Sequence, residues 1–312
     1  MTTKKAITAT VLFEAESLNH NEGFANNVEL KKMTRGNGAT HTYVSRQTLR
    51  YDMVRMGNEL FDWNLDTVDD STNVVQFKKD LTIEDSVEMD LFGYMRTKTK
   101  KATDGATTKR LSPVRINTAH SLEPFVYDTD FQTNAGLAQR IDAKNAIVNA
   151  EMHKSLYSYT FTINLEAIGR DKNDGTVLSD EEKFNRLKEL LTIIQFLNRN
   201  IRGRQENLNP VFIIGGIYPI ANPFFEGRMR IYNASNAFGL DLELLKSIDS
   251  STFMSTAISD YTKVGSLSNY FENEADMKAY FGNRFSTVDT FFANLIQEVA
   301  AYYEVEYEAT SN

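Results

Sequence analysis

Apolar and polar side chains alternate near the N-terminus, over residues 6–18. One side of this alternation collects only apolar residues, which are Ile7, Ala9, Val11, Phe13 and Ala15. A period of two residues is typical of a strand that buries one face. We therefore predict a half-buried strand here, the first strand of a core sheet. Residues 157–168 alternate in the same way, and residues 210–219 form an apolar run between prolines, so both are predicted to be further strands.

A period of 3.6 residues predicts three helices in the second half of the chain. The clearest covers residues 179–202, where Ser179 and Glu182 have the spacing of a capping box. Its core stripe consists of Phe184, Leu187, Leu190, Leu191, Ile194, Leu197 and Ile201. A short helix is predicted over residues 240–248, and the last helix starts at residues 286–289. Residues 227–233 are predicted to form another strand.

A strand is also predicted to run directly into a helix, over residues 40–57. Thr40–Val44 has strand character, and Ser45 is a plausible N-cap for the helix that follows. The helix has an apolar face made by Leu49, Met53 and Met56, at positions i, i+4 and i+7. Gly57 is predicted to end it. Further along, the apolar residues 91–95 are predicted to be the end of a strand.

Composition excludes several classes of protein. The chain has 312 residues, is 41% hydrophobic and 24% charged, and contains no cysteine. It can therefore bury a sizeable core, and a disulfide scaffold, a thiol nucleophile and a Cys-ligated metal site are excluded. No apolar run approaches the roughly 20 residues of a membrane span, and the N-terminus lacks the apolar core of a secretory signal. We expect a cytoplasmic protein with no membrane partner, folded as one domain over residues 1–312.

Charge is distributed unevenly along the chain, whose net charge is −8. Residues 31–55 hold one acid, Asp52, against six basic residues, which are Lys31, Lys32, Arg35, Arg46, Arg50 and Arg55. Arg46 and Arg50 are four residues apart and so project from one face of the predicted helix. The N-terminus of a helix offers free N–H groups and a positive dipole end. This segment is therefore either a seat for phosphates or a solvated basic helix.

An acidic segment follows, over residues 58–90. It has ten acidic residues against Lys78 and Lys79, which gives a segment charge of −8. Such a surface repels phosphates, so we interpret it as an insertion that faces away from nucleic acid or docks on a basic partner. Trp63, the only tryptophan, is expected in the core.

A second basic stretch covers residues 96–115. It contains one acid, Asp104, and seven basic residues, which are Arg96, Lys98, Lys100, Lys101, Lys109, Arg110 and Arg115. Its middle is rich in Thr, Ala, Gly and Lys, which indicates a loop. The loop is either a solvated surface feature or an electrostatic arm for a nucleic-acid backbone, with Lys98, Lys100 and Lys101 at its centre. We favour the arm, because two basic stretches flank the acidic segment.

Histidines and carboxylates are the only candidates for catalysis. The four histidines share no metal-ligand spacing, so a zinc site is not expected. His120 is the best general acid–base candidate, although we favour the explanation that it is a hydrogen-bonded histidine at a strand end. Glu14, Glu16 and Glu22 lie near the first strand and could line a nuclease site.

Three blocks of the sequence carry a family resemblance. They are THTYVSRQTLRYDM at residues 40–53, LFGYM at residues 91–95 and SPVRINTAHS at residues 112–121. Together they resemble the DevR-type backbone subunit of type I CRISPR Cascade complexes, with subtype I-B as the expected subtype. That family places a Ser-x-Gln-x-Leu-basic helix after its first strand, matched by Ser45, Gln47, Leu49 and Arg50. The resemblance covers roughly residues 7–161.

The resemblance implies an α+β fold with an RRM-like (ferredoxin-like) palm. It implies a fingers insertion at residues 58–90, a basic loop at residues 96–115 and a thumb insertion at residues 124–156. The recognisable aromatic motifs with which RRM domains stack bases are missing. The implied function is to polymerise head-to-tail along the spacer of a CRISPR RNA and present it to target DNA in antiviral defence. This task requires neither an enzymatic activity nor a cofactor.

The implied partners are CRISPR RNA, target DNA in the R-loop, further copies of the chain and other Cascade subunits. Those subunits are the one that caps the five-prime handle, the large subunit and the guide-processing endonuclease. Contacts should go to phosphate and sugar, because the spacer can have any sequence. The expected RNA contacts are Lys32, Arg35, Ser45, Arg46, Gln47 and Arg50, then Asn19, Asn21, Arg96, Arg115 and His120. In the thumb the candidates are Arg140, Lys144, Met152 and Lys154.

Two other functions remain open from the sequence. One is an RRM-like endoribonuclease that uses His120 or a carboxylate. Type III relatives of the family use an aspartate near the start of the palm, but this chain has Asn19, Asn21 and Glu22 there. The other is a regulator that binds RNA sequence-specifically. If the chain polymerises, the acidic insertion with Asp66, Asp69 and Asp70 could meet a basic surface on the next subunit.

Overall fold

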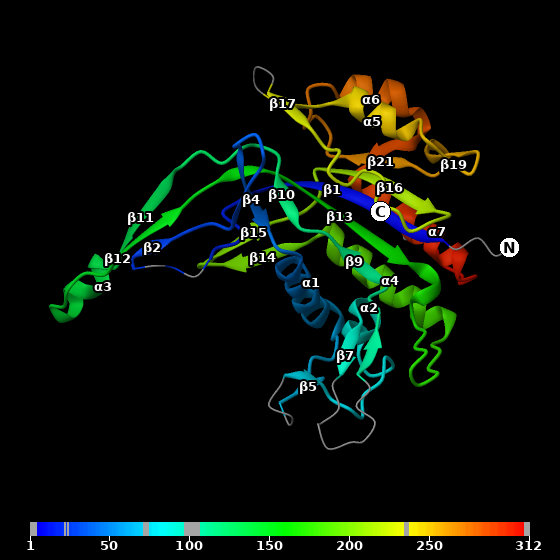
Figure 1. Ribbon diagram of the computed structural model, residues 1–312, viewed down its shortest axis with the longest axis horizontal. Helices are drawn as coiled ribbons and strands as arrows, with labels where there is room; N and C mark the ends of the chain where they lie inside the picture. The colour runs from blue at the N-terminus through cyan, green and yellow to red at the C-terminus, as the bar shows by residue number, and fades with distance from the viewer. Residues whose placement is uncertain are drawn as a thin grey trace.

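A large sheet forms the centre of the molecule (Figure 1). The computed structural model describes residues 5–21, 23, 25–70, 75–96, 107–233 and 237–308. The main path of the sheet is β22-β21-β16-β1-β13-β10-β4-β3, and β9 also pairs with β13. In chain order these strands are β1 (Ala6–Glu16), β3 (Lys32–Thr34), β4 (Thr40–Val44), β9 (Val114–Ile116), β10 (Ala119–Ser121), β13 (Lys154–Asn164), β16 (Phe212–Tyr218), β21 (Lys263–Ser266) and β22 (Phe285–Thr287).

Strand β1 lies in the middle of this sheet. It pairs antiparallel with β13 along its whole length, from Ala6↔Asn164 to Glu16↔Lys154, and antiparallel with β16 on its other side. The predicted strand is confirmed, but the prediction of one solvent-facing side is wrong. Leu12, on the side expected to be polar, is fully buried in a second apolar cluster, because a C-terminal layer covers that face.

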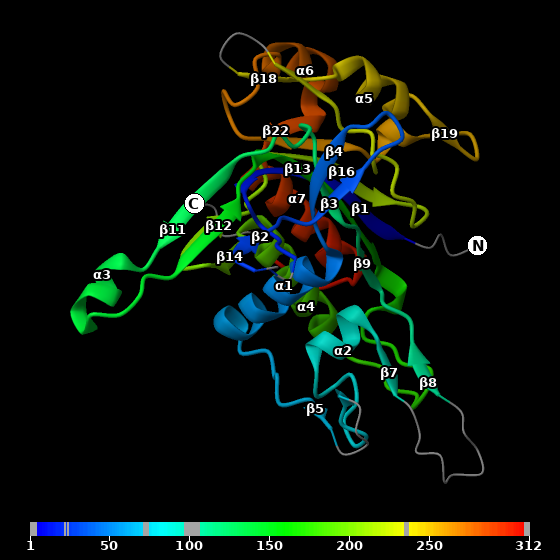
Figure 2. The same cartoon turned by 60° about the vertical axis from the view of Figure 1, so that its left-hand side comes forward.

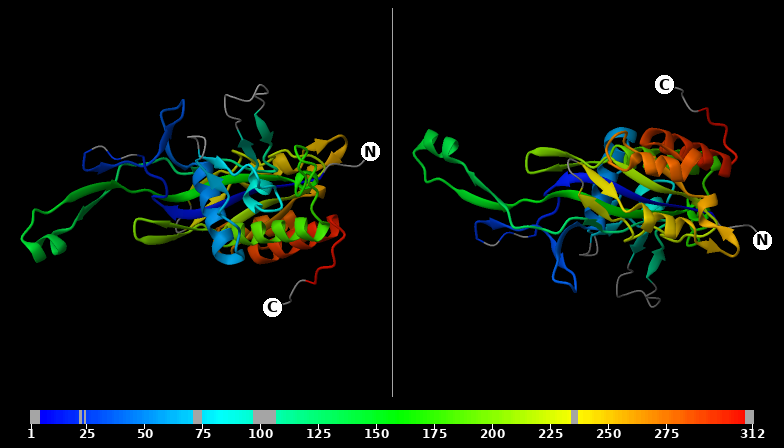
Figure 3. Two further views of the ribbon diagram at one scale, coloured as in Figure 1. Left: turned by 90° about the horizontal axis from the view of Figure 1, so that it is seen from below. Right: turned by 90° about the horizontal axis from the view of Figure 1, so that it is seen from above.

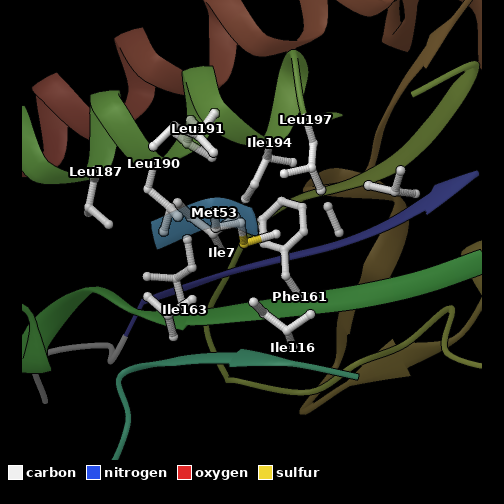
Figure 4. Close-up of a cluster of buried hydrophobic side chains, with 14 of the residues drawn as sticks. Ile7, Met53, Ile116, Phe161, Ile163, Leu187, Leu190, Leu191, Ile194 and Leu197 are labelled. Carbon is white, nitrogen blue, oxygen red and sulfur yellow. The ribbon is translucent and has the colours of Figure 1, made fainter. Parts of the chain in front are cut away.

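Three helices cover one face of the sheet. They are α1 (Arg46–Phe61), α4 (Asp180–Gln195) and α7 (Val288–Tyr302). Figure 4 shows Leu187, Leu190 and Ile194 of α4 pointing at Ile7 and Phe161 from the strands. These side chains are fully buried, and each buried apolar side chain contributes about 1.5–3 kcal/mol.

The opposite face is covered over part of its area by the C-terminal part of the chain (Figure 1). This layer contains the helices α5 (Leu242–Asp249) and α6 (Glu274–Phe281). It also contains the short strands β17 (Ile231–Asn233), β18 (Phe238–Leu240), β19 (Thr252–Phe253) and β20 (Thr256–Ala257). Phe212 and Ile214 of β16 pack here with Phe225 and Met229.

The start of α1 is as predicted, and its end is not. Ser45 is the N-cap, and its hydroxyl accepts the N–H of Thr48. The helix continues through Gly57 to Phe61 and ends at Asp62, which has left-handed φ. Gly57 is needed for packing instead, because a Cβ there would lie 2.2 Å from the ring of Trp63, which is buried as expected.

Other predicted boundaries also shift. Helix α4 starts at its predicted cap, Ser179, but ends at Gln195, and Asn198–Ile201 forms β14, which pairs with β15 (Arg204–Asn207). Residues 91–92 belong to the helix α2 (Val87–Phe92) rather than to a strand, and β7 (Tyr94–Arg96) follows. The strand predicted over residues 227–233 is limited to β17, Ile231–Asn233. The helix predicted over residues 240–248 starts two residues later, at Leu242.

Two projections extend from the sheet in different directions (Figures 1 and 2). One is a long hairpin of β11 (Thr129–Thr133) and β12 (Ile147–Glu151), with α3 (Ala135–Ala138) and a 3-10 turn at its tip; Figure 3 shows it reaching away from the rest of the chain. Strand β2 (Asn27–Val28) pairs with its root. The other contains β5 (Val68–Asp69), β6 (Gln76–Phe77), α2, β7 and β8 (Thr108–Arg110).

A buried ionic network attaches the second projection to the sheet and to α4. Asp90 is fully buried, and its carboxylate accepts hydrogen bonds from Arg110 (2.6 Å), Arg186 (3.1 Å) and the N–H of Gly169 (2.9 Å). Arg110 also donates to the backbone carbonyl of Asp90. The network therefore joins four segments that are distant in the sequence.

The architecture combines one large, mainly antiparallel sheet with separate helices, which is compatible with the predicted α+β class. Over the part of the chain that the structure describes, no helix has the length and apolar character needed to cross a membrane.

Candidate nucleic-acid interface

The N-terminus of α1 presents free donors at the sheet edge. Strand β4 leads into the helix at Ser45, and the exposed side chains of Arg46 and Gln47 start its first turn. The Ser45 hydroxyl satisfies Thr48 N–H at 3.2 Å, and the N–H groups of Arg46 and Gln47 have no backbone or side-chain acceptor among the described residues. Two backbone donors and one guanidinium thus converge where an anion would be held.

The charges in this first turn oppose the helix dipole. Acidic residues usually occupy the positive end of a helix, as in α4 (Asp180, Glu181 and Glu182) and α7 (Asp289). The first turn of α1 contains no acidic residue, and Arg46 stands there instead. This placement costs about 0.3–1 kcal/mol unless an anion lies between the guanidinium and the helix.

Three of the six basic residues of segment 31–55 are engaged within the chain. Lys32 pairs with Glu151 (2.6 Å), Arg50 with Glu88 (2.5 Å) and Arg55 with Glu59 (2.6 Å). Arg50 also lies 5.1 Å from the ring centroid of Phe92. The other three, Lys31, Arg35 and Arg46, form no ion pair with any described residue. The free positive charge of the segment is therefore half of what the sequence suggests.

The free cations follow one edge of the sheet. Strand β3 is the edge strand, and Lys31, just before it, accepts the N–H of Tyr43, two residues from the helix cap. Arg35 lies at the other end, in the turn between β3 and β4, where its N–H bonds the carbonyl of Ala39. This basic edge, defined by Lys31, Arg35 and Arg46, is our candidate for contacts with a nucleic-acid backbone.

Lys32 anchors the long hairpin instead of facing solvent. Its ammonium group binds both carboxylate oxygens of Glu151, at 2.6 and 2.8 Å, and lies 5.0 Å from the centroid of the Phe125 ring. Glu151 is buried and also accepts the N–H of Leu30. Both ends of the hairpin are thus tied to β3.

Replacing Glu151 with Gln is expected to loosen this attachment, because the amide keeps the shape but loses the charge that holds Lys32. We expect the free energy of unfolding to fall by about 1–3 kcal/mol and amide hydrogen exchange to rise over residues 129–151. Glu29→Gln, at an exposed neighbouring site, removes the same charge and serves as control. Equal exchange in the two variants would show that the ion pair does not anchor the hairpin.

His120 is half-buried on β10, opposite Ser158 of β13 and Tyr43 of β4. Burial lowers its pKa below the usual value; the charge of Glu226 opposes this shift, and the charges of His41 and Arg35 add to it. The ring is therefore neutral at pH 7. Its Nδ1 is buried without a hydrogen-bond partner among the described residues.

In the second basic stretch, Arg96 and Arg110 are engaged in contacts within the chain, whereas Arg115 is exposed. Arg96 donates to the backbone carbonyls of Leu81 and Lys79, and Arg110 belongs to the Asp90 network. Arg115 is exposed on β9, opposite Thr162. The arm residues Lys98, Lys100 and Lys101 lie outside the described residues.

The remaining candidates lie around the long hairpin and its root. Arg140 and Lys144 are exposed near its tip, Met152 is half-buried at its root, and Lys154 pairs with Glu14 at 3.0 Å. The hairpin also exposes large apolar side chains, which are Phe131, Leu137, Ile141 and Ile147. Its tip thus carries both apolar and basic groups.

The loop after β1 contains the last two candidates. Asn19 is buried with an unpartnered Nδ2, and Asn21 is exposed. Both residues flank His20, which follows β1 and forms an isolated antiparallel bridge with Leu30.

Glu14 and Glu16, near β1, are engaged within the chain, and Glu22 lies outside the described residues. Burial alone would raise the pKa of Glu14, but hydrogen bonds from Lys154 and Tyr270 lower it. Glu16 pairs with Arg204 at 2.8 Å. Among the described residues, no group of three or more His, Asp or Glu side chains is placed to hold a metal ion.

Sequence reasoning missed one group of residues. Arg230 and Glu226 come from the segment between β16 and β17, and they line a cavity together with Arg35, His41 and His120. The pair Arg228 and Arg230 was visible in the sequence. However, these arginines are more than a hundred residues from His120, so the sequence did not show that Arg230 and His120 line the same cavity.

Comparisons with known proteins give one family and two similar structures. The family described as "CRISPR-associated negative auto-regulator DevR/Csa2" matches residues 7–228 of the 312, more than two thirds of the chain. A chain of a "CRISPR RNA-guided surveillance complex" is 16% identical, with a TM-score of 0.56 over 95% of this chain and 99% of that one. A chain of a "CRISPR RNA-guided surveillance complex, pre-nicking" is 14% identical, with a TM-score of 0.58 and the same coverage. No curated protein matches the sequence. At these identities the two structures are evidence for a shared fold.

Proposed function

We propose, from the premise that this chain belongs to the CRISPR-associated DevR family, that it is the RNA-coating backbone subunit of a type I Cascade complex. In this role several copies line up head-to-tail along the spacer of a CRISPR RNA and hold it open for pairing with target DNA. Base pairing supplies the specificity, and the protein holds the backbone.

The strand order supports an RRM-like palm. In chain order the central elements are β1, α1, β9 with β10, β13, α4 and β16. In space the strands run β16, β1, β13 and then β9 and β10, with both helices on one face. This is the connectivity of a ferredoxin-like fold, with a split β-α-β unit on each side. The long hairpin would be the thumb, and the projection with α2 would be the fingers.

The face of this palm opposite the helices has no stacking platform. Thr10 and Thr160 lie on its central strands, where an RRM places aromatic side chains, but both are buried and share a hydroxyl hydrogen bond of 2.7 Å. Ser158 and Thr162 continue this row on β13. The RNA is therefore more favourably held at the basic edge than on the central strands.

The single observation that carries the proposal is the start of α1. Free N–H groups, the Ser45 cap and the exposed guanidinium of Arg46 combine at one place, with Lys31 and Arg35 along the same edge. Such groups bind the phosphates of an RNA whatever its base sequence. A protein that coats arbitrary spacers needs this property.

Polymerisation needs a heterologous contact that does not close into a ring. The apolar thumb tip and the acidic fingers lie on different sides of the palm, so one copy can contact the next without using the same surface twice (Figure 2). Of the three acids predicted at this contact, Asp66 pairs with Lys78 within the fingers. Further parts of the proposal are subtype I-B, a cytoplasmic location, no enzymatic activity and no cofactor.

Purification from cells that carry a CRISPR array tests the proposal. We expect the chain to retain a discrete small RNA, with nuclease protection at regular intervals because copies repeat along the strand. Protein free of RNA, and still monomeric after a guide RNA is added, would contradict it. RNA cleavage that disappears in His120→Ala would instead support the alternative, an endoribonuclease of the same fold. Strong preference among short oligonucleotides would support a sequence-specific regulator.

A further inference from the structure

A cavity of about 430 Å³ lies on the open face of the sheet, between the β3–β4 hairpin and the segment after β16. Its volume falls in the range of small-molecule sites. Nine of its twelve lining residues lie within residues 7–228, and Met229, Arg230 and Ile231 follow directly after that range. The cavity therefore lies where the part that matches the family meets the residues that follow it.

The pairing register of the strands shows which side chains form the floor of the cavity. His120 of β10 faces Ser158 of β13 on one side and Tyr43 of β4 on the other. His41 lies two residues from Tyr43, so it projects from the same face. Its Nδ1 lies 2.8 Å from the carbonyl oxygen of Ser121, so Nδ1 carries a proton and donates it to this hydrogen bond.

The wall is rigid. Phe225 and Met229 are buried in the second apolar cluster with Phe212 and Leu240, which fixes the segment that carries Glu226 and Arg230. The N–H of Asp241 also bonds the carbonyl of Arg230. The cavity is therefore preformed, and a ligand need not order this segment.

Its charged groups have no partners within the described chain. Arg35, Arg230 and Glu226 line the cavity, and none of them forms an ion pair or side-chain hydrogen bond with a described residue. Arg35 and Arg230 are exposed, and Glu226 is half-buried. Other half-buried charges nearby, such as Lys32 and Arg50, are paired. The buried Nδ1 of His120 is a fourth unpartnered group.

We infer that this cavity binds a single guanine nucleotide. Arg35 and Arg230 provide two positive charges for its phosphate, and Arg can bind phosphate in a bidentate manner. The carboxylate of Glu226 accepts two hydrogen bonds, and guanine offers it two adjacent donors, N1–H and the 2-amino group. Adenine, cytosine and uracil do not present such a pair. Met33, Met229 and Ile231 supply apolar surface for the faces of the base.

The nucleotide can come from two sources, a free guanosine phosphate or a guanosine within a bound RNA strand. The inference rests on the cavity and not on the proposed RNA coating. The two are tested separately, because Lys31 and Arg46 do not line the cavity.

Calorimetric titration of the RNA-free full chain with GMP, AMP, CMP and UMP tests the inference. GMP should bind at least about tenfold more tightly than the others, the discrimination of one good bidentate base contact. Glu226→Gln should remove this preference, and Arg230→Ala should weaken GMP without changing the affinity for guanosine. Glu243→Gln, an exposed acid outside this cavity, is the control and should behave as the unaltered chain.

Octamers with and without one guanosine distinguish the sources. Tighter binding of the guanosine-containing octamer that is lost in Glu226→Gln identifies a strand nucleotide, whereas equal binding of the octamers with tight GMP binding identifies a free nucleotide. Equal affinity for all four mononucleotides, unchanged by Glu226→Gln, would overturn the inference and leave the basic edge unaffected.

Discussion

Replacing Arg46 and Arg50 together with alanine is expected to lower the affinity for single-stranded RNA about 100-fold, or about tenfold for each lost phosphate contact. Arg46 stands free at the positive end of α1, and Arg50, one turn further on the same face, would exchange its ion pair with Glu88 for a phosphate. The loss should be equal for unrelated sequences, because phosphates carry no base information. In a titration of affinity against salt, the slope should decrease by about 1.4, or 0.7 for each phosphate on a single strand.

A matched control removes the same charge elsewhere. Lys246 on α5 and Lys278 on α6 are surface cations in i,i+3 and i,i+4 pairs, and changing both to alanine should leave affinity and slope almost unchanged. Glu88→Gln provides a change in the opposite direction, since it releases Arg50 from its carboxylate partner and should strengthen binding at low salt. A loss limited to some RNA sequences in the double variant would count against backbone recognition.

Asp90→Asn is expected to lower the free energy of unfolding by about 3–5 kcal/mol. The change keeps the shape of the side chain but removes the buried carboxylate that Arg110 and Arg186 share, and both guanidinium groups are almost inaccessible to solvent. Arg110 then keeps only Asp171, at 3.8 Å, and Arg186 keeps only the partly exposed Glu182. Denaturant unfolding followed by circular dichroism measures the effect.

Asp66→Asn removes a charge of the same kind from an exposed ion pair with Lys78 and should cost no more than about 1 kcal/mol. If Asp90→Asn changed stability as little as this control, the network would not hold the fingers to the palm.

Local chemistry made much of the fold predictable. The alternation of residues 6–18, the Ser45 and Ser179 caps and the apolar face of α1 depend on neighbours in the sequence, and the structure confirms each. The errors came from tertiary contacts. Gly57 continues a helix because the Trp63 ring needs the space, and both faces of β1 are buried because the C-terminal layer covers one of them.

The candidate site was less predictable for the same reason. Charge counting found the basic segment, but two of the three acids that pair with its basic residues are distant in the sequence. Glu151 is 119 residues from Lys32, and Glu88 is 38 residues from Arg50. No periodicity marks such pairs. The exposed Arg46 could be predicted, since its helix start and cap are local features.

The stoichiometry of assembly on RNA tests the central claim most directly. Mass measurement of complexes formed on two unrelated sequences, each at two lengths, shows how many copies bind each strand. The account predicts that the number of copies doubles when the RNA length doubles and is the same for both sequences. A single copy per strand at both lengths, or assembly on only one of the sequences, would contradict it.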